Sequence, residues 1–346
     1  MRASLFILAF MFSGFPLSHS YSLECLQPES TPEFLRQAER QQLENKIKTK
    51  DALNRQLNED WQWFIDMRKR IMIISDEAII KDGLNGSSSR RNPTAKIASV
   101  QQRFMSRFLK EIQSEKKFVE DPKRAERLIV ALTLYGEFNT NAHRSLPHLF
   151  WANQVIQNRA NLSPWKDQAI DSRYDPKGEA SQFFRSANAN RASMALVKSQ
   201  FSSWNPGDSN LSKIILANSS IQTRDIVEFV AAQDAGIVVT KDNKELPILT
   251  HYISPGSLPI ASQEEREKNE GLEKRLPKVE AQEFLVDRIY PNWWFDSGTL
   301  QRYTSQDLPE IIRLDQDNKA GLVSVAAGSY ESKVNPRHFV GIRRRN

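Results

Sequence analysis

The most chemically suggestive side chain in this sequence is the carboxylate of Glu137, which follows an apolar run. Residues 128–137 read Leu-Ile-Val-Ala-Leu-Thr-Leu-Tyr-Gly-Glu, and their apolar side chains recur at the spacing of a helix with one buried face. Gly136 is a typical helix end, so we expect Glu137 just past the C-terminus of that helix. Burial and the negative end of the helix dipole both disfavour an ionised carboxylate, which suits a general acid. An ordinary glutamate in a helix-terminal turn is the alternative that this stretch leaves open.

An ordered set of segments accompanies Glu137 along the chain. The most distinctive is 199–210, which reads Ser-Gln-Phe-Ser-Ser-Trp-Asn-Pro-Gly-Asp-Ser-Asn. The others are Tyr135-Gly136-Glu137, Val155 to Ala160 with Trp165, Thr250-His251-Tyr252, Asn292-Trp293-Trp294 and His338-Phe339. In this order they resemble the cell-wall hydrolase family typified by the spore-cortex-lytic enzymes, the SleB-like family. The resemblance covers residues 120–346, with insertions near 171–193 and 258–288, and does not reach 23–119.

The resemblance implies a lysozyme-like fold that acts on peptidoglycan glycan strands, with Glu137 as the catalytic acid. Family members described as lytic transglycosylases cleave the β-1,4 bond between N-acetylmuramic acid and N-acetylglucosamine, and leave a 1,6-anhydro product. There the sugar's own 6-hydroxyl attacks, so one carboxyl serves as acid and then base, whereas an ordinary glycosidase needs two carboxylates. The sequence offers no obvious second carboxylate, because Asp208 lies in a Pro-Gly-Asp turn that its side chain would ordinarily cap.

One departure from the family pattern follows the catalytic position. The family segment often continues as Ala-Arg-Gly-Glu, whereas this chain has Asn139 in place of the Arg and Asn141 in place of the second Glu. Two alternatives to a transglycosylase therefore stay open. One is a hydrolytic muramidase of the same bond, and the other is a non-catalytic cell-wall-binding protein that kept the fold.

Further residues are candidates for the glycan-binding groove, each with an ordinary structural alternative. Trp204 suits stacking on a sugar or core packing, and Asn205 suits the groove or a turn. The full set of substrate-binding candidates is Tyr135, Gln200, Ser202, Trp204, Asn205, Thr250 and Tyr252. The pair Asn158-Arg159 is expected to tie the fold together. No metal or cofactor is expected, because His143 and His148 are five residues apart instead of the four that suit one helix face.

Composition and the N-terminus predict an exported protein. Residues 1–22 combine Arg2 with a short apolar run and small residues near Ser20, the pattern of a cleaved secretory signal, with an uncleaved anchor as the alternative. Cys25 is the only cysteine, which excludes a disulfide framework. The formal net charge of +6 fits an anionic polymer such as cell wall or the outer face of a membrane, and no nucleic-acid partner is expected. We therefore expect the periplasm or cell envelope of a bacterium.

The elements that position Glu137 are predicted to form an α+β, mainly α, protein. Residues 120–346 would be the lysozyme-like domain, with 237–240 as a strand, 171–193 as a surface excursion and closing strands at 321–327 and 338–342. Residues 23–119 read as a charged helical region, either a hairpin or short coiled coil or a helix packed on the main domain. This region is a candidate surface for self-association or for a cell-envelope partner. Its apolar stripe is Leu53, Leu57, Trp61, Phe64, Met67, Ile71 and Ile74, and a third helix carries Ile97, Val100, Phe104, Phe108 and Ile112 on one face.

Overall fold

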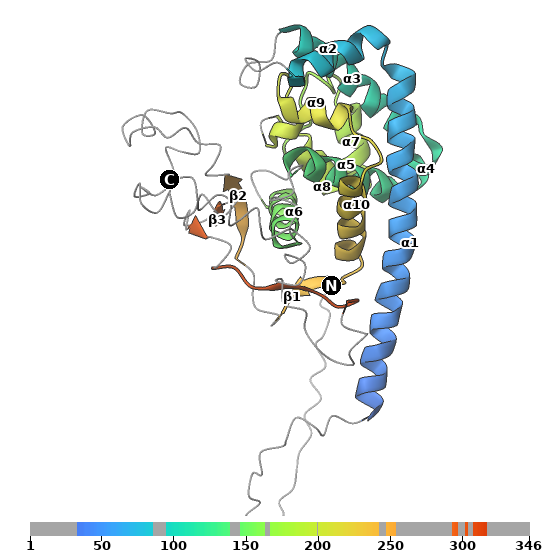
Figure 1. The fold of residues 1–346 in the computed structure, drawn as a ribbon, viewed down its shortest axis with the longest axis vertical. Helices are drawn as coiled ribbons and strands as arrows, with labels where there is room; N and C mark the ends of the chain where they lie inside the picture. The colour runs from blue at the N-terminus through green and yellow to red at the C-terminus, as the bar shows by residue number, and fades with distance from the viewer. Residues whose placement is uncertain are drawn as a thin grey trace, which may run out of the picture. The chain divides into compact units, whose positions relative to one another are not determined.

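The computed structural model describes residues 33–85, 95–138, 146–162, 167–198, 200–241, 247–253, 293–296, 302–303 and 307–316. This part of the chain is mainly helical, with a few short strands (Figure 1). The predicted α+β, mainly α, class is therefore confirmed. The chain divides into two compact units, residues 1–42 and residues 43–346. Of the first unit, the structure describes only the beginning of helix α1, which runs Glu33–Ile71.

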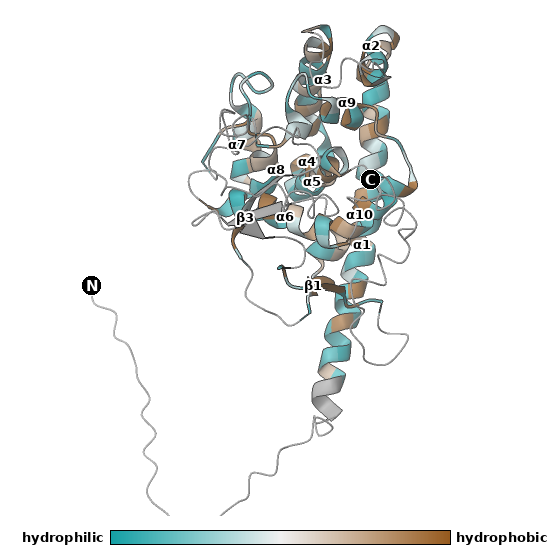
Figure 2. Cartoon of the chain, turned by 60° about the vertical axis from the view of Figure 1, so that its left-hand side comes forward, coloured by the Kyte–Doolittle hydropathy of each residue, from teal (hydrophilic) through white to brown (hydrophobic). Residues whose placement is uncertain are grey.

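The predicted apolar stripe of α1 is buried within the second unit. Hydrophilic and hydrophobic residues interleave along this helix (Figure 2). The stripe residues that are at most 2% exposed are Leu57, Trp61, Phe64 and Met67. Ile74 does not extend the stripe and is 90% exposed. The reason is that α1 ends at Ile71, and Ile74 begins the separate helix α2, Ile74–Asn85.

Residues 43–119 share one hydrophobic core with the residues that follow them. Phe64 of α1 packs edge-on against Phe104 and Phe108 of helix α3, Ala95–Ser114, with ring centroids 6.1 and 5.4 Å apart. The predicted buried face of α3 is confirmed, and its residues belong to the same core cluster as Leu128. Residues 43–119 accordingly lie in the same compact unit as the residues that follow them. From Leu43 on, α1 is a helix packed on the main core, because its buried stripe residues belong to the same core cluster.

A buried carboxylate also ties α1 to the helices after α3. Asp60 is 1% exposed and pairs with Lys117 of α4, Lys116–Glu120, at 2.9 Å. It also accepts a 2.7 Å bond from Arg124 of α5, which runs Pro122–Glu137. A buried charge is costly unless it is paired in this way. The arrangement therefore fixes α4 and the start of α5 against α1.

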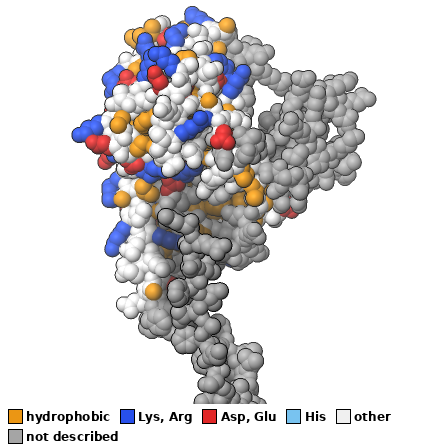
Figure 3. All heavy atoms as spheres, turned by 180° about the vertical axis from the view of Figure 1, so that it is seen from behind, with side chains coloured by type: hydrophobic (Ala, Val, Ile, Leu, Met, Phe, Trp, Pro, Cys, Tyr) orange, Lys and Arg blue, Asp and Glu red, His pale blue; other side chains and the backbone are white. Residues whose placement is uncertain are grey.

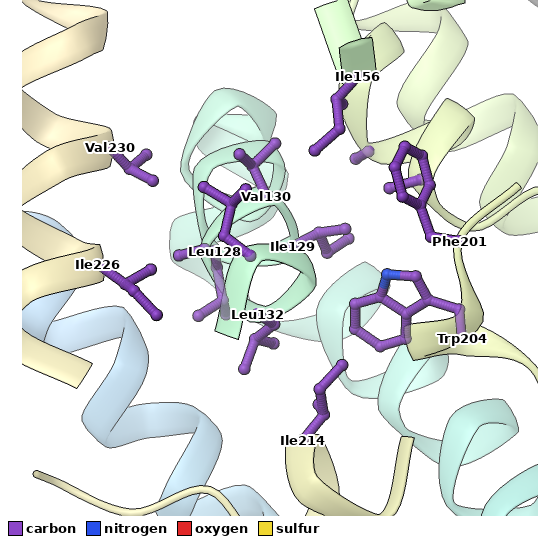
Figure 4. Close-up of a cluster of buried hydrophobic side chains, with 14 of the residues drawn as sticks. Leu128, Ile129, Val130, Leu132, Ile156, Phe201, Trp204, Ile214, Ile226 and Val230 are labelled. Carbon is purple, nitrogen blue, oxygen red and sulfur yellow. The ribbon is translucent and has the colours of Figure 1, made fainter. Parts of the chain in front are cut away.

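Helix α5 lies at the centre of the core. Leu128, Ile129, Val130 and Leu132 are fully buried. Figure 4 shows α5 between α10, which contributes Ile226 and Val230, and the segment that carries Phe201 and Trp204. The neighbouring helices are α6, Leu146–Asn161, and α10, Ile221–Asp234. Helix α5 therefore runs through the core before it ends at Glu137.

The segment 171–193, expected as a surface excursion, instead joins the core. It contains helix α7, Glu179–Ser186, and the start of helix α8, Asn190–Ala195. Tyr174 is 3% exposed and Phe184 is fully buried. The polar side chains of this segment are satisfied locally, because Asp175 accepts bonds from the backbone of Ala180 and Ser181 at the start of α7. Low apolar content therefore did not mean exposure.

The short strands follow the helices. Strand β1, Val238–Thr240, confirms the predicted strand and pairs antiparallel with β5, Ile311–Arg313. Strand β3, Trp293–Asp296, lies between β2, Leu249–Ile253, and β4, Arg302–Tyr303, in an antiparallel sheet. The insertion at 258–288 and the strands expected at 321–327 and 338–342 fall outside the described residues, as does the expected signal at 1–22.

The described surface carries charges of both signs. Lys and Arg side chains are spread over the upper part of one face, and Asp and Glu side chains lie among them (Figure 3). Within the described ranges, no helix is both long enough and apolar enough to cross a membrane.

Replacing Phe64 by Ala should lower the free energy of unfolding by about 3–5 kcal/mol, because the ring leaves a cavity between Phe104 and Phe108 that the helices cannot close. Chemical denaturation followed by circular dichroism measures this change. Ile74→Ala, at a side chain that is 90% exposed, is the control and should shift stability by less than about 0.5 kcal/mol. Equal effects of the two variants would contradict the packing of α1 into the main core.

Candidate active site

Helix α5 delivers Glu137 to the site. Asp121 caps its beginning by accepting a 3.1 Å bond from the backbone N–H of Lys123, and Pro122 occupies the first turn. The helix continues through Gly136 and ends at Glu137, where the backbone N–H of Phe138 bonds to Leu134 at 2.9 Å. The expectation that Gly136 stops the helix is therefore corrected. Glu137 is the last helical residue and not the one after the end.

Gly136 instead allows a neighbouring segment to lie very close to the backbone of α5. A Cβ built there would lie 2.8 Å from Ser203 Oγ and 2.9 Å from the Cδ1 atom of Ile214. Any larger side chain would therefore push away the short 3-10 helix η3, Ser202–Trp204, and helix α9, Ser209–Ile215. The absence of a side chain at Gly136 lets η3 lie directly against the last turn of α5.

The close approach places three hydrogen-bond donors on one oxygen of Glu137. Oε1 accepts bonds from Ser202 Oγ at 2.9 Å, from the backbone N–H of Ser203 at 2.9 Å and from Ser203 Oγ at 2.5 Å. No described residue donates to Oε2. The side chain is half-buried. Donors of this kind stabilise an ionised carboxylate, and a protonated one would keep Oε1 as acceptor and carry its proton on Oε2.

In the part of the chain that the structure describes, the groups that hydrogen-bond to Glu137 are neutral. Among the described residues, no Lys, Arg or His lies within ion-pair distance of its carboxylate. Some buried carboxylates of this chain are paired with cations, as Glu126 is with Arg191 at 3.2 Å, whereas Asp175 is held by neutral donors as Glu137 is. A cation would hold a carboxylate in its charged form, whereas hydroxyls and an amide bind either protonation state. Within the described residues, hydrogen bonds from neutral groups therefore orient the carboxylate of Glu137.

Further polar residues stand behind the serines. Asn210 donates from Nδ2 to Ser202 Oγ at 2.7 Å, and Lys213 donates from Nζ to Asn210 Oδ1 at 2.7 Å. The side chain of Asp208 caps α9 by accepting a 2.7 Å bond from the backbone N–H of Asn210. Asp208 therefore fulfils the turn-capping role that its Pro-Gly-Asp context favours.

Electrostatics links Asp208 and Lys213 to Glu137. Burial is the main cause that raises the pKa of Asp208; the backbone N–H of Asn210 opposes it and the charge of Glu137 adds to it. Burial also lowers the pKa of Lys213, against the attraction of Asp208 and Glu137. The charge of Glu137 therefore acts on both Asp208 and Lys213.

The turn that carries the serines is anchored by buried side chains. Trp204 donates from Nε1 to Thr133 Oγ1 at 2.8 Å and stacks on Phe108 with ring centroids 6.4 Å apart. Trp204 is 1% exposed, so it is a core residue and its ring presents no face to a sugar. The hydroxyl of Tyr174 donates to the backbone carbonyl of Trp204. Both contacts fix η3 against α5.

Gln101 anchors the following turn from α3. It is fully buried, donates to the carbonyl of Asp208 at 2.9 Å and to Ser212 Oγ at 2.8 Å, and accepts from the N–H of Gly207 at 2.5 Å. Sequence reasoning missed this residue, although an amide on the apolar face of α3 was a usable signal. Reasoning from sequence also passed over Thr133, Ser203, Asn210 and Lys213, whose roles depend on contacts between distant segments.

Some of the remaining predicted site residues are buried or half-buried away from Glu137, and others lie among residues that the structure does not describe. Tyr135 is half-buried and meets the ring of Trp61 edge-on at 5.5 Å, and Thr250 is fully buried. Gln200 and Asn205 lie partly exposed on either side of η3. Tyr252 pairs with Trp294 between β2 and β3, but its side chain is outside the description, as are Asn139, Asn141 and Trp165.

The Asn158-Arg159 pair ties α6 to its neighbours. Arg159 donates from Nε to the carbonyl of Thr250 at 2.5 Å and from NH1 to the carbonyl of Gln200 at 2.8 Å. Asn158 donates from Nδ2 to the carbonyl of Leu249 at 2.8 Å. The two side chains therefore hold β2 and the segment before η3 next to α6.

Comparison with known proteins adds nothing to this picture, since no family model, no curated protein and no solved structure matches the chain.

Gly136→Ala should destabilise the protein by about 1–3 kcal/mol, because overpacking against the backbone-anchored η3 exceeds the roughly 1 kcal/mol that Ala gains over Gly in a helix. Thermal and urea unfolding measure the change. Gly83→Ala is the comparison, since its Cβ would meet only the flexible end of Ile97. A stabilised Gly136→Ala variant would show that η3 does not need this close approach.

Proposed function

We propose that this chain is a peptidoglycan-cleaving enzyme with a lysozyme-like catalytic domain, in which Glu137 is the general acid. The observation that carries the proposal is the set of bonds from Ser202 and Ser203 to Glu137 at 2.5–2.9 Å. These residues come from Tyr135-Gly136-Glu137 and from 199–210, two of the segments on which the resemblance to the SleB-like family rests. A fold that joins them at a half-buried carboxyl supports a common catalytic role.

The proposed reaction cleaves the β-1,4 bond between N-acetylmuramic acid and N-acetylglucosamine. Glu137 donates the proton on Oε2 to the glycosidic oxygen, which leaves with the N-acetylglucosamine side of the strand. The 6-hydroxyl of the muramic acid then attacks its own C1, and Glu137 Oε2 takes the hydroxyl proton. The product is the 1,6-anhydro sugar, and the carboxyl returns to its starting state. Throughout, the donors on Oε1 stabilise the carboxylate that forms after the first proton transfer.

A single carboxyl suits this chain better than a pair. Hydrolysis by two carboxylates requires one on each side of the bond that breaks. Asp208 lies behind Asn210 and is engaged as the cap of α9, so it is poorly placed as that partner. This favours the transglycosylase over the hydrolytic muramidase, which remains the alternative, together with a cell-wall-binding protein without activity.

The substrate and place of action follow from the same proposal. Glycan strands of the bacterial cell wall are the substrate, and export through residues 1–22 would bring the enzyme to the periplasm or cell envelope. The positive net charge of +6 complements an anionic wall. Because residues 43–119 are largely taken up by core packing, self-association or an envelope partner would use their exposed side.

Glu137→Gln should lower the release of soluble fragments from purified sacculi by at least about 100-fold, because an amide N–H is far too weak an acid to protonate the glycosidic oxygen. Mass spectrometry of the products should find 1,6-anhydro ends for the unaltered protein. Glu179→Gln, at an exposed position on α7, is the matched control and should keep full activity. Asp208→Asn should keep the same products.

Reducing ends in place of anhydro ends would identify a hydrolase. Full activity of Glu137→Gln would exclude the proposed acid. Binding to sacculi without any release by the unaltered protein would point to the non-catalytic alternative.

A further inference from the structure

A chain of hydrogen bonds leads from Lys213 to the proposed acid. Lys213 Nζ donates to Asn210 Oδ1 at 2.7 Å, and Asn210 Nδ2 donates to Ser202 Oγ at 2.7 Å. Ser202 Oγ donates to Glu137 Oε1 at 2.9 Å. The chain crosses from α9 through η3 to the end of α5. It therefore connects three elements whose relative position the site requires.

The direction of this chain is set at its two ends, because Glu137 Oε1 accepts and the Lys213 ammonium donates, whereas the groups between them can turn. A serine hydroxyl either donates or accepts, and an asparagine amide offers a donor or an acceptor depending on which way it is turned. An ammonium group only donates. Lys213 therefore requires the oxygen of Asn210 to face it, which turns the NH₂ group toward Ser202. Since Ser202 Oγ then accepts from Asn210, its own proton is free for Glu137.

Lys213 is also unusual in its own partners. It is half-buried, yet within the described part of the chain no carboxylate lies within ion-pair distance of its Nζ. Desolvating an ammonium without a close counter-ion is unfavourable, and burial accordingly lowers its pKa. A lysine needed only to stabilise the fold would gain more from a carboxylate, as Lys50 does from Asp315 at 2.7 Å. Here the charged donor is instead directed at an amide oxygen.

We propose that Lys213 is a positioning residue that fixes the direction of the hydrogen-bond chain ending on Glu137 Oε1. Through Asn210 it keeps Ser202 a donor to the carboxyl. Its expected effect on cleavage rests on the proposed function, whereas its effect on Asn210 does not.

Without Lys213, Asn210 is free to turn its oxygen toward Ser202. The Ser202 hydroxyl would then donate to Asn210 and withdraw its proton from Glu137. The carboxylate would lose one of its three donors when charge develops on it. Lys213 would influence the reaction step more than glycan binding, because it contacts neither Oε2 nor the exposed side of the carboxyl.

The first test needs no activity. The side-chain amide of Asn210, assigned by its absence in Asn210→Asp, is followed by nitrogen-15 NMR during hydrogen exchange. In the unaltered protein its protons should exchange slowly, and Lys213→Met should speed their exchange about tenfold, because the amide is no longer held in one orientation. Lys213→Arg keeps a charged donor and should preserve the slow exchange. Lys177→Met, at a side chain that is 80% exposed, is the control.

The second test measures cleavage of glycan fragments by the same variants. Loss of one hydrogen bond to the reacting carboxyl should lower kcat of Lys213→Met about tenfold with less than a twofold change in KM. Lys213→Arg should retain at least half of the rate. Thermal unfolding of each variant shows that the fold is kept.

The outcomes separate the two proposals. Unchanged exchange of the Asn210 amide in a folded Lys213→Met protein overturns the role of Lys213, whether or not the chain is an enzyme. Faster exchange in a protein that never cleaves glycan supports that role and rejects the proposed function. Faster exchange with unchanged kcat in an active enzyme overturns the positioning of Glu137 by Lys213.

Discussion

The structure of the candidate site depends on one close contact, between the last turn of α5 and the 3-10 helix η3. Gly136 has no side chain, so Ser203 can lie in the space that a Cβ would occupy at this position; a Cβ would lie only 2.8 Å from Ser203 Oγ. One turn earlier, Thr133 donates to Ile129 at 2.7 Å and accepts the indole N–H of Trp204 at 2.8 Å. The buried indole is thereby satisfied without an opening to solvent. Thr133, Gly136 and Glu137 lie at helical spacing on one side of α5, so η3 packs against this one face of the helix.

This contact also explains how the chain treats charge in two different ways. Two buried carboxylates, Asp60 and Asp315, are paired with Lys or Arg. Such pairs hold the carboxylate in its charged form and tie the elements together. Glu137 is held by hydroxyls and a backbone amide instead. Neutral donors also hold the buried carboxylate of Asp175, so the fold uses both ion pairs and neutral donors to fix its carboxylates.

Much of the helical framework could be predicted from the sequence, because periodic burial leaves a periodic pattern. The stripe of α1 and the buried face of α3 were predicted from local spacing. The sequence did not predict which elements pack on these helices. An apolar stripe shows that a helix face is buried, but it does not identify the residues that cover it. The prediction that residues 171–193 form a surface excursion was wrong, because their polar groups hydrogen-bond to one another. Asp175 accepts bonds from the backbone of Ala180 and Ser181, which allows this polar segment to be buried.

Glu137 and its neighbours show the same limit at the site itself. The sequence by itself determined that a carboxylate ends a buried helix and that 199–210 forms a compact turn with Asp208 as its cap. Only the tertiary structure decided that Gly136 is a point of contact, that Trp204 belongs to the core, and that Ser203, Asn210 and Lys213 stand behind Glu137. Spacing along one helix or turn is a local property that the sequence records directly. Which donor meets Oε1 depends on how α5, η3 and α9 pack, and packing brings together residues more than 60 positions apart.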